Sequence, residues 1–130
     1  MTEFSNALSV AASGMRAQAQ RLTHVSENIA NADTPGYQRK ITSFEVERGM
    51  GTTEGTVRPG PVRLDQTVLP QIFDPAHPMA DDTGHYEGSN VDLVVELADA
   101  REAQRSYEAN LRVFDQIRQM STSLNDLLRR

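Results

Sequence analysis

The 130-residue sequence contains no cysteine and no tryptophan, and aromatic residues make up only 5% of it. The absence of cysteine excludes disulfides, thiolate nucleophiles and cysteine-ligated metal sites. With so few aromatic side chains, we do not expect a large compact core built on aromatic anchors. The length is that of one domain, so we predict a single unit over residues 1–130 without a separate catalytic module.

Long apolar runs and basic clusters are also missing. No apolar stretch approaches the roughly 18 residues that a membrane span requires. Polar residues such as Glu3 and Asn6 interrupt the N-terminal segment, where a secretory signal would be apolar. We therefore expect neither membrane insertion nor a cleaved signal peptide. The net charge of −5 and the scattered basic residues argue against nucleic acid or an anionic membrane as a partner.

Proline and glycine are nearly absent from the two ends of the chain. All 6 prolines, and every one of the 8 glycines except Gly14, lie between Pro35 and Gly88. The unbroken flanks predict helices over residues 1–32 and 89–130, joined by a loop and strand insert over residues 33–88. We predict a mainly α fold: two long antiparallel helices in a coiled-coil-like hairpin, with a small irregular β-hairpin and loop insert.

Both flanks carry apolar side chains at alternating spacings of three and four, which keep one helix face towards a partner. The predicted contact stripe comprises Leu8, Met15, Leu22, Val25, Ile29, Leu97, Leu111, Phe114, Ile117, Met120, Leu124 and Leu128. Two helices of about 42 and 60 Å would leave apolar edges uncovered. We expect the stripe to serve both the helix pair and contacts with other subunits. In an antiparallel pair, Leu8 should lie near Leu124, and Leu22 near residues 107–111.

Local signals predict how these elements begin and end. The turn at residues 33–36 ends the first helix, and Asn28 and Asn31 are interpreted as its C-terminal caps, or as anchors of the turn into the insert. Ser89 is the predicted N-cap of the second helix, with Asp92 completing a capping box. Partial alternation predicts strands over residues 41–46 and 62–68, with a mobile loop over residues 49–60 between them.

The candidates for chemistry are weak. His77, Asp81, Asp82 and His85 are spaced at about four residues, which would make a metal-binding face on a helix. Pro78 and an adjacent glycine disfavour a helix there, and favour a turn in which aspartate caps backbone amides. The glycine-rich stretch at residues 49–55 has no following lysine, so we interpret it as a flexible loop and not a phosphate loop. We expect no catalytic residue, no cofactor and no metal, and therefore no enzyme.

Three segments resemble the flagellar axial protein family, whose members form the rod and hook. The first is Asn28-Ile-Ala-Asn-Ala-Asp-Thr-Pro-Gly-Tyr37, similar to the family's N-terminal signature through Asn28, Asn31, Thr34, Pro35, Gly36 and Tyr37. The second resembles the family's C-terminal helix start through Asn90, Val91, Asp92 and Glu96, and the third is similar to the same helix through Arg105, Ser106, Tyr107 and Asn110. Asp74, Pro75, Pro78 and Asp81 and the short chain resemble the proximal rod members.

This resemblance implies a structural subunit of the proximal rod in the basal body of the bacterial flagellum. It implies export through the flagellar type III apparatus, without a cleaved signal, into a drive shaft that spans the periplasm. The implied partners are other copies of the chain and rod proteins of the FlgB, FlgF, FlgG and FliE types. The alternatives are another axial subunit of FlgB or FlgF/FlgG type, or a cytoplasmic coiled-coil adaptor or chaperone. We also hypothesise that the free subunit is only partly ordered.

Overall fold

The computed structural model describes residues 2–130 and contains two helices with short strands between them. Helix α1 covers Thr2–Ala30 and α2 covers Leu93–Leu128. The strands are β1 (Lys40–Ile41), β2 (Phe44–Val46), β3 (Val57–Pro59), β4 (Arg63–Leu64), β5 (Gln71–Phe73) and β6 (His85–Glu87). The prediction of a mainly helical fold with a small β insert is confirmed at this level.

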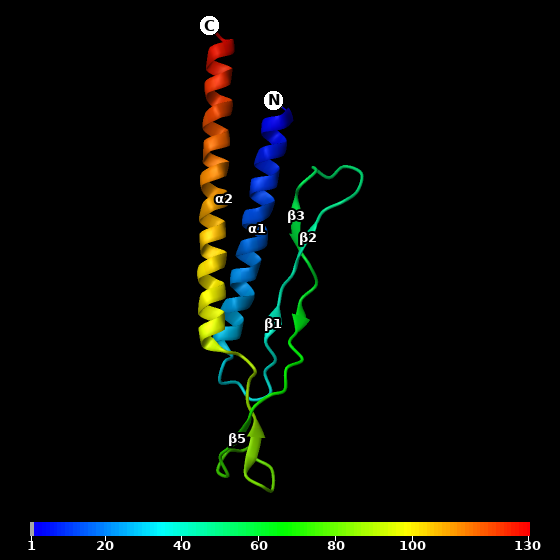
Figure 1. The fold of residues 1–130 in the computed structure, drawn as a ribbon, viewed down its shortest axis with the longest axis vertical. Coiled ribbons are helices and arrows are strands. Elements are labelled where there is room, and N and C mark those ends of the chain that lie inside the picture. Colours follow the sequence, from blue (N-terminus) through cyan, green and yellow to red (C-terminus); the bar gives the residue numbers. More distant parts are fainter. Residues whose placement is uncertain (1) are drawn as a thin grey trace.

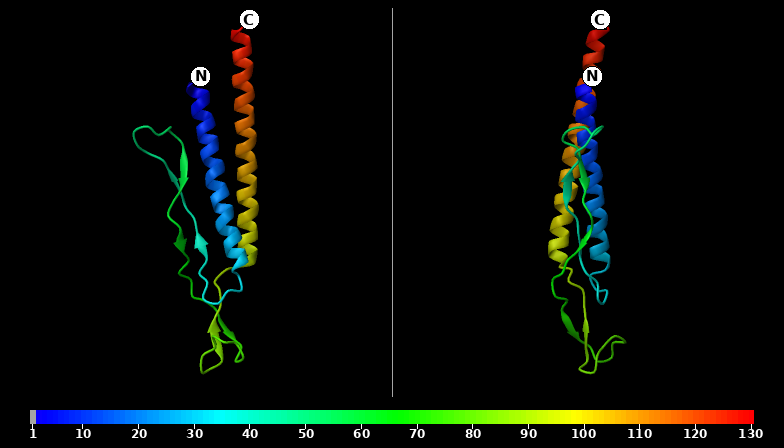
Figure 2. Two further views of the ribbon diagram at one scale, coloured as in Figure 1. Left: turned by 180° about the vertical axis from the view of Figure 1, so that it is seen from behind. Right: turned by 90° about the vertical axis from the view of Figure 1, so that its right-hand side faces the viewer.

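The two helices lie side by side, with both chain termini at the same end of an elongated molecule (Figures 1 and 2). Helix α2 continues past the start of α1 at that end (Figure 1). Neither helix, as far as residues 2–130 are described, is both long enough and apolar enough to span a bilayer.

Small residues carry the contact between the helices. Ala11 on α1 and Ala103 on α2 are at most 4% exposed. At Gly14, an added Cβ atom would lie 2.9 Å from Nδ2 of Asn110. Because little side-chain volume separates the helices here, their backbones approach closely, as small residues permit at helix interfaces.

The register of the helix pair differs from the prediction. Phe4, and not Leu8, lines the same hollow as Leu124. Arg21 forms an ion pair with Asp99, so Leu22 lies about two to three helical turns away from the predicted level at residues 107–111. The reason is that polar contacts at the base of the helices determine the alignment, and apolar spacing alone cannot reveal them.

The insert forms three two-stranded antiparallel sheets, and the predicted strands were partly wrong. β1 pairs with β4, β2 with β3 and β5 with β6. β3 lies within residues 49–60, which were predicted to be a loop, and β5 and β6 were not predicted. Strands of two or three residues interrupted by prolines are too short to produce a clear alternating pattern.

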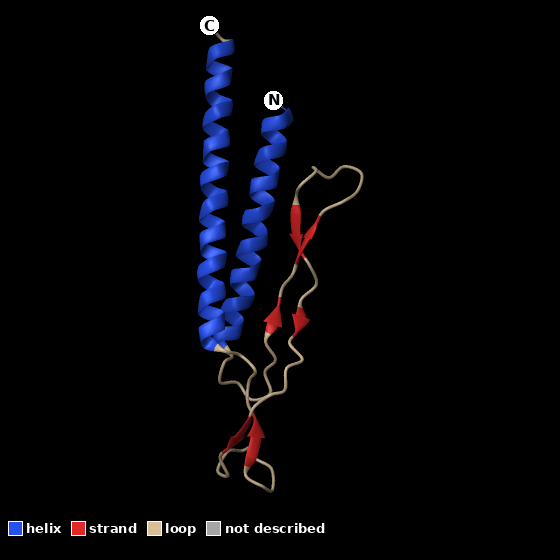
Figure 3. Ribbon diagram, in the orientation of Figure 1, coloured by secondary structure: helices blue, strands red, loops and turns tan. Residues whose placement is uncertain are grey.

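The β2–β3 hairpin runs alongside α1, whereas the β5–β6 hairpin projects at the end of the molecule opposite the termini (Figures 1 and 3). The first hairpin is attached to α1 through Ser13, whose Oγ accepts a hydrogen bond of 3.1 Å from the backbone N–H of Val57. That hydroxyl donates in turn to the carbonyl of Val10 at 2.7 Å. Ser13 is buried and has both of these partners, so its polar group is satisfied.

The start of α2 was also predicted wrongly. Its N-cap is Asp92, whose side chain accepts a hydrogen bond of 3.0 Å from the N–H of Val94. Ser89 instead accepts a bond from the N–H of Val91, in the connection before the helix. The connection is not helical because its backbone forms a hydrogen bond with another segment of the chain. The N–H of Asn90 donates to the carbonyl of Tyr37.

Candidate subunit interface

A polar junction joins the base of both helices to the insert. It comprises Asn28, Tyr37, Arg39, Lys40, Asn90 and Glu96. Asn28 is 1% exposed, and its Oδ1 accepts hydrogen bonds of 2.9 Å from both the N–H of Lys40 and the hydroxyl of Tyr37. Its Nδ2 donates to the carbonyl of Lys40 at 3.0 Å and to Glu96 at 3.3 Å. Asn28 therefore joins three segments of the chain.

The two asparagines of the signature have different roles. Asn28 bonds to the insert and to α2, so its interpretation as a C-terminal cap was wrong and the alternative, an anchor of the insert, is confirmed. Asn31 donates from Nδ2 to the carbonyl of Glu27 at 2.8 Å, and thus satisfies one of the free carbonyls at the end of α1. The hydroxyl of Thr34 donates to Oδ1 of Asn31 at 3.0 Å, which supports the turn that follows.

Glu96 is the charged centre of the junction. Its side chain has no exposed surface, and its carboxylate forms an ion pair with Nε of Arg39. A buried carboxylate is costly unless it is paired, so Arg39 and Asn28 are necessary partners. Arg39 also lies 3.9 Å from Asp65 of the insert. Glu96 is part of the C-terminal signature, and the structure gives it a buried partner that the sequence did not indicate.

Asn90 links the two chain segments that enter and leave the insert. Its Oδ1 accepts a 2.6 Å bond from the N–H of Arg39, and its Nδ2 donates to the carbonyls of Asp65 and Thr67 at 3.0 and 3.2 Å. Gly36 adds a bond from its N–H to the carbonyl of Gly88 at 3.2 Å, with a φ of 73° that favours glycine. The hydrogen bonds of Asn90 and Gly36 therefore fix the direction of the insert relative to the helices.

Charges around the junction reinforce it. Nζ of Lys40 lies 2.5 Å from a carboxylate oxygen of Glu27. This hydrogen bond lowers the pKa of Glu27 and raises the pKa of Lys40, so both groups are charged at neutral pH. Burial raises the pKa of the Tyr37 hydroxyl, which keeps it protonated as a donor to Asn28.

The β5–β6 hairpin holds the remaining signature residues of the insert. Oδ1 of Asp81 accepts hydrogen bonds from the N–H groups of Thr83 at 2.9 Å and His85 at 3.1 Å, and the bonds from Thr83 lower the pKa of Asp81. Asp74 accepts from the N–H of Ala76 at 3.2 Å, in the turn that contains Pro75 and Pro78. The interpretation that aspartates cap backbone amides here is confirmed. Among residues 2–130, no three His, Asp or Glu side chains are grouped as a metal site.

The signature residues within α2 have separate environments. Asn110 faces Gly14 of α1, and Tyr107 lines a shallow hollow with Met15 and other α1 residues. Ser106 is half-buried, whereas Arg105 is exposed. Val91 is half-buried in the connection that precedes the helix.

The predicted contact stripe divides into an inner and an outer part. Val25 is buried, and Leu8, Met15, Leu22, Ile29, Phe114 and Ile117 are half-buried. The outer α2 stripe, defined as Leu97, Leu111, Val113, Met120, Leu124, Leu127 and Leu128, is exposed, with values from 38% at Leu124 to 74% at Leu128. Most of the large apolar side chains of α2 therefore do not pack on α1.

The outer stripe ends in a hollow of about 560 Å³ near the termini, which we call the terminal hollow. Its lining is Phe4, Gln116, Gln119, Met120, Ser123, Leu124 and Leu127. Phe4 of α1 forms one side of this hollow, and α2 continues beyond the start of α1 (Figure 1). Exposed apolar surface of this kind is typical of protein interaction sites.

Comparisons with known proteins give the same identification for both flanks. The family model described as "Flagella basal body rod protein" matches residues 8–38. The model described as "Flagellar basal body rod FlgEFG protein C-terminal" matches residues 82–127. The first match includes Asn28, Tyr37 and the other N-terminal signature residues, and the second contains Asn90 and Glu96.

Relatives align over almost the whole chain. The flagellar basal-body rod protein FlgC of Agrobacterium fabrum is 40% identical, and the alignment covers 99% of this chain and 98% of the relative. The protein of the same name from Aquifex aeolicus is 37% identical over 88% of this chain and 89% of the relative, and that of Salmonella typhimurium is 32% identical over 88% and 90%. The chain therefore belongs to the FlgC family of flagellar basal-body rod proteins.

Proposed function

We propose that this rod protein is a structural subunit of the proximal rod, and that residues 1–130 act as one rod-subunit domain. Members of the family are structural components of the basal body and not enzymes. The observation that carries the proposal is the outer α2 stripe, because its apolar side chains remain 38–74% exposed within the chain. In a rod, these side chains would be buried against the helices of neighbouring subunits.

The helices would then be completed by assembly. Within the chain, α1 and α2 meet through alanine, glycine and asparagine, and the leucines of α2 stay largely exposed. Coiled-coil-like packing, with apolar knobs entering holes on a facing helix, would place Leu111, Leu124 and Leu128 between subunits. Each leucine buried in this way contributes roughly 1.5–3 kcal/mol.

The polar junction would give the subunit a fixed shape in the rod. Asn28, Asn90 and Glu96 hold the insert at one orientation to the helices through buried bonds. We propose that the signature residues serve this purpose, and that none of them binds a ligand. A uniform angle between helices and insert lets identical contacts repeat around a rod.

The proposed partners are further copies of the chain and rod proteins of the FlgB, FlgF, FlgG and FliE types. The proposed route to the rod is the flagellar type III export apparatus, without removal of a signal peptide. The chain would pass through this apparatus unfolded, because the folded insert and the long helices would have to unfold before passage.

Replacing Leu124 and Leu128 with aspartate tests the role of the outer stripe. Assembly would have to bury two unpaired charges near the negative end of the α2 dipole, so we expect rods not to form. Export requires no folded contact surface, so the tagged variant should still leave the cytoplasm while the cells remain without hooks and non-motile. Cell fractionation and microscopy of basal bodies measure both results.

The matched control is Arg101→Ala/Arg112→Ala, which changes the net charge by the same amount at two exposed α2 positions outside the stripe. This control should still assemble. Normal rods and normal swimming with Leu124→Asp/Leu128→Asp would show that the stripe is not a subunit contact. Degradation of that variant in the cytoplasm would show that the stripe serves only the fold of the subunit.

A further inference from the structure

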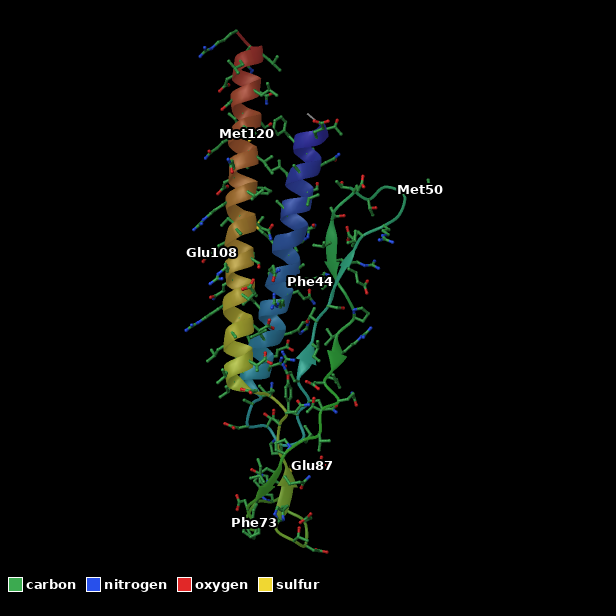
Figure 4. All side chains as sticks on the ribbon, viewed as in Figure 1. Phe44, Met50, Phe73, Glu87, Glu108 and Met120 are labelled. Atoms are coloured by element: carbon green, nitrogen blue, oxygen red, sulfur yellow. The ribbon has the colours of Figure 1, made fainter. Side chains whose placement is uncertain are left out.

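We propose that the β5–β6 hairpin contains a proton-sensitive turn, which the neutral ring of His77 holds closed and the protonated ring opens. The hairpin end, defined as residues 70–88, contains β5, β6 and the turns between them. It projects from the molecule at the end opposite the termini, and Phe73 and Glu87 lie on it (Figures 1 and 4). The inference goes beyond the proposed function, because it concerns how the shape of this hairpin depends on pH.

His77 joins two successive turns of the backbone. Its N–H donates to the carbonyl of Asp74 at 3.0 Å, and its carbonyl accepts from the N–H of Ala80 at 3.0 Å. The N–H of Met79 donates to Nδ1 of the His77 ring at 3.1 Å. Pro78, between them, has no N–H. Both N–H groups that follow His77 in the second turn therefore bind to His77, one at its carbonyl and one at its ring.

The hydrogen bond from Met79 defines the form of the His77 ring. A backbone N–H can only donate, so Nδ1 accepts with its lone pair and the proton of the neutral ring is on Nε2. A protonated ring carries a hydrogen on both nitrogens. The N–H of Met79 and a protonated Nδ1 would then be two donors facing each other. The bond therefore exists only while the ring is neutral.

Tyr86 of β6 holds the His77 ring in place. The two rings are stacked, with centroids 3.9 Å apart and an interplanar angle of 11°. A cation is also attracted to the face of an aromatic ring, so the stack is retained after protonation. Met79 is 63% exposed, and little packing opposes its movement. Protonation of His77 would therefore move the backbone at Met79 and leave the ring where it is.

The charged groups near His77 come from the hairpin end itself, because this segment projects from the rest of the molecule (Figure 1). Its other titratable residues are Asp74, Asp81, Asp82, His85, Tyr86 and Glu87. It contains no lysine or arginine. Histidine is the side chain that ordinarily changes charge between about pH 5 and pH 8. The hydrogen bonds from Thr83 lower the pKa of Asp81, so this group stays charged throughout that range. The turn is thus closed above the range in which histidine titrates and open below it.

His85 lies in the same hairpin without this sensitivity. The hydroxyl of Thr83 donates its one hydrogen to Oδ1 of Asp81 at 2.6 Å. That hydroxyl can therefore only accept from Nδ1 of His85, which lies 3.1 Å away and must carry a proton. Protonation of His85 adds a second hydrogen at Nε2 and leaves this bond intact. His85 is therefore an internal control for His77.

Opening of the turn would change the apolar surface of the hairpin end. Phe73 and Met79 are 65% and 63% exposed on this surface. Loss of the bond to the Met79 N–H would shift the Met79 side chain relative to Phe73. If the chain works outside the cytoplasm, as proposed, the shape of this surface would follow the pH of that compartment.

Nuclear magnetic resonance of the purified full-length chain tests the inference without any substitution. At about pH 7.5, ring ¹⁵N shifts should place the proton on Nε2 of His77 and on Nδ1 of His85. At about pH 5, the protection of the Met79 N–H from exchange, corrected for the intrinsic rate, should be about three- to tenfold lower, since one hydrogen bond is lost. A proton on Nδ1 of neutral His77, or equal protection of Met79 at the two pH values, would overturn the inference.

Asparagine at either histidine provides matched variants. Its Oδ1 can accept from the N–H two residues ahead and does not titrate, so His77→Asn should keep Met79 protected at both pH values. Its Nδ2 can donate in place of Nδ1 of His85, so His85→Asn should retain the pH response of the unmodified chain. His77→Phe can still stack on Tyr86 but offers no acceptor, and should lower the protection of Met79 at both pH values. A pH response that persists in His77→Asn, or disappears in His85→Asn, contradicts the assignment to His77.

Discussion

At the scale of single residues, the polar junction shows how one side chain can unite distant segments. Asn28 makes four hydrogen bonds: with the backbone of Lys40 at both its N–H and its carbonyl, with Tyr37 and with Glu96. An amide can accept at its oxygen and donate twice from its nitrogen, so one asparagine satisfies both groups of a backbone segment. No other side chain of similar size offers this combination except glutamine, which is longer.

Replacing Asn28 with alanine tests this role. The backbone N–H of Lys40 and the carboxylate of Glu96 would each lose a partner in a buried place, so we expect a loss of stability of about 1–3 kcal/mol. Urea unfolding of the full-length chain, followed by circular dichroism, measures the change. Asn31→Ala, which removes only the cap at the end of α1, is the matched control and should cost less. Equal losses for the two variants would show that Asn28 has no special role.

At the scale of elements, the two helices approach through small side chains and leave large ones outside. Gly14 of α1 lies against Asn110 of α2 and Ala103 has no exposed surface, whereas Leu111 and Met120 are exposed at 41% and 54%. Small residues allow close backbone approach, and the remaining apolar area of α2 is then available to other chains. The helix pair is thus only one part of the packing that its sequence encodes.

Replacing Gly14 with leucine tests the close approach. Leucine has a higher helix propensity than glycine, so α1 itself should tolerate it. The added side chain would meet Asn110 and force α1 and α2 apart, at a cost of about 1–3 kcal/mol. Ala19→Leu, at an exposed position of the same helix, is the control and should leave the urea midpoint unchanged. A midpoint for Gly14→Leu equal to or above that of the control would rule out tight packing at this position.

At the scale of the whole molecule, the fold is stable at the junction and poorly supported at the end with the termini. The buried polar contacts of Asn28 and Glu96 lie at one end of the helices, and the exposed outer stripe continues to the other. An element with few buried apolar contacts opens readily. We infer that order in the free subunit decreases from the junction towards the termini, and that assembly completes it.

Circular dichroism of the dilute monomer tests this inference. Helices α1 and α2 hold 29 and 36 of the 130 residues, which is half of the chain. We expect the monomer to show clearly less helix than this. Amides near residue 28 should resist hydrogen exchange more than those near residue 124. A fully helical monomer that melts cooperatively above about 60 °C would contradict the inference, since that temperature is in the upper mesophile range.

The positions of the helix breakers were sufficient to predict the architecture from the sequence. Helices need long segments without proline and glycine, and only the two flanks have them, so α1 and α2 were located to within a few residues. The predicted stripe also contained the residues of the outer α2 stripe except Val113 and Leu127, because apolar side chains on a solvated helix require a partner. The family resemblance rested on the same two flanks, and the comparisons confirmed it.

Only the tertiary structure decided which side chains face each other. The helix register, the buried pair of Glu96 and Arg39, and the anchoring of Lys40 by Asn28 join residues that are far apart in the sequence. Apolar periodicity shows that a helix has a contact face, but small and polar residues produce no periodic signal even where they form the closest contact. The strands of the insert are too short to show alternation, and their pairing depends on α1 and on the junction. These features arise from contacts between residues that are distant in the sequence, so local sequence patterns cannot predict them.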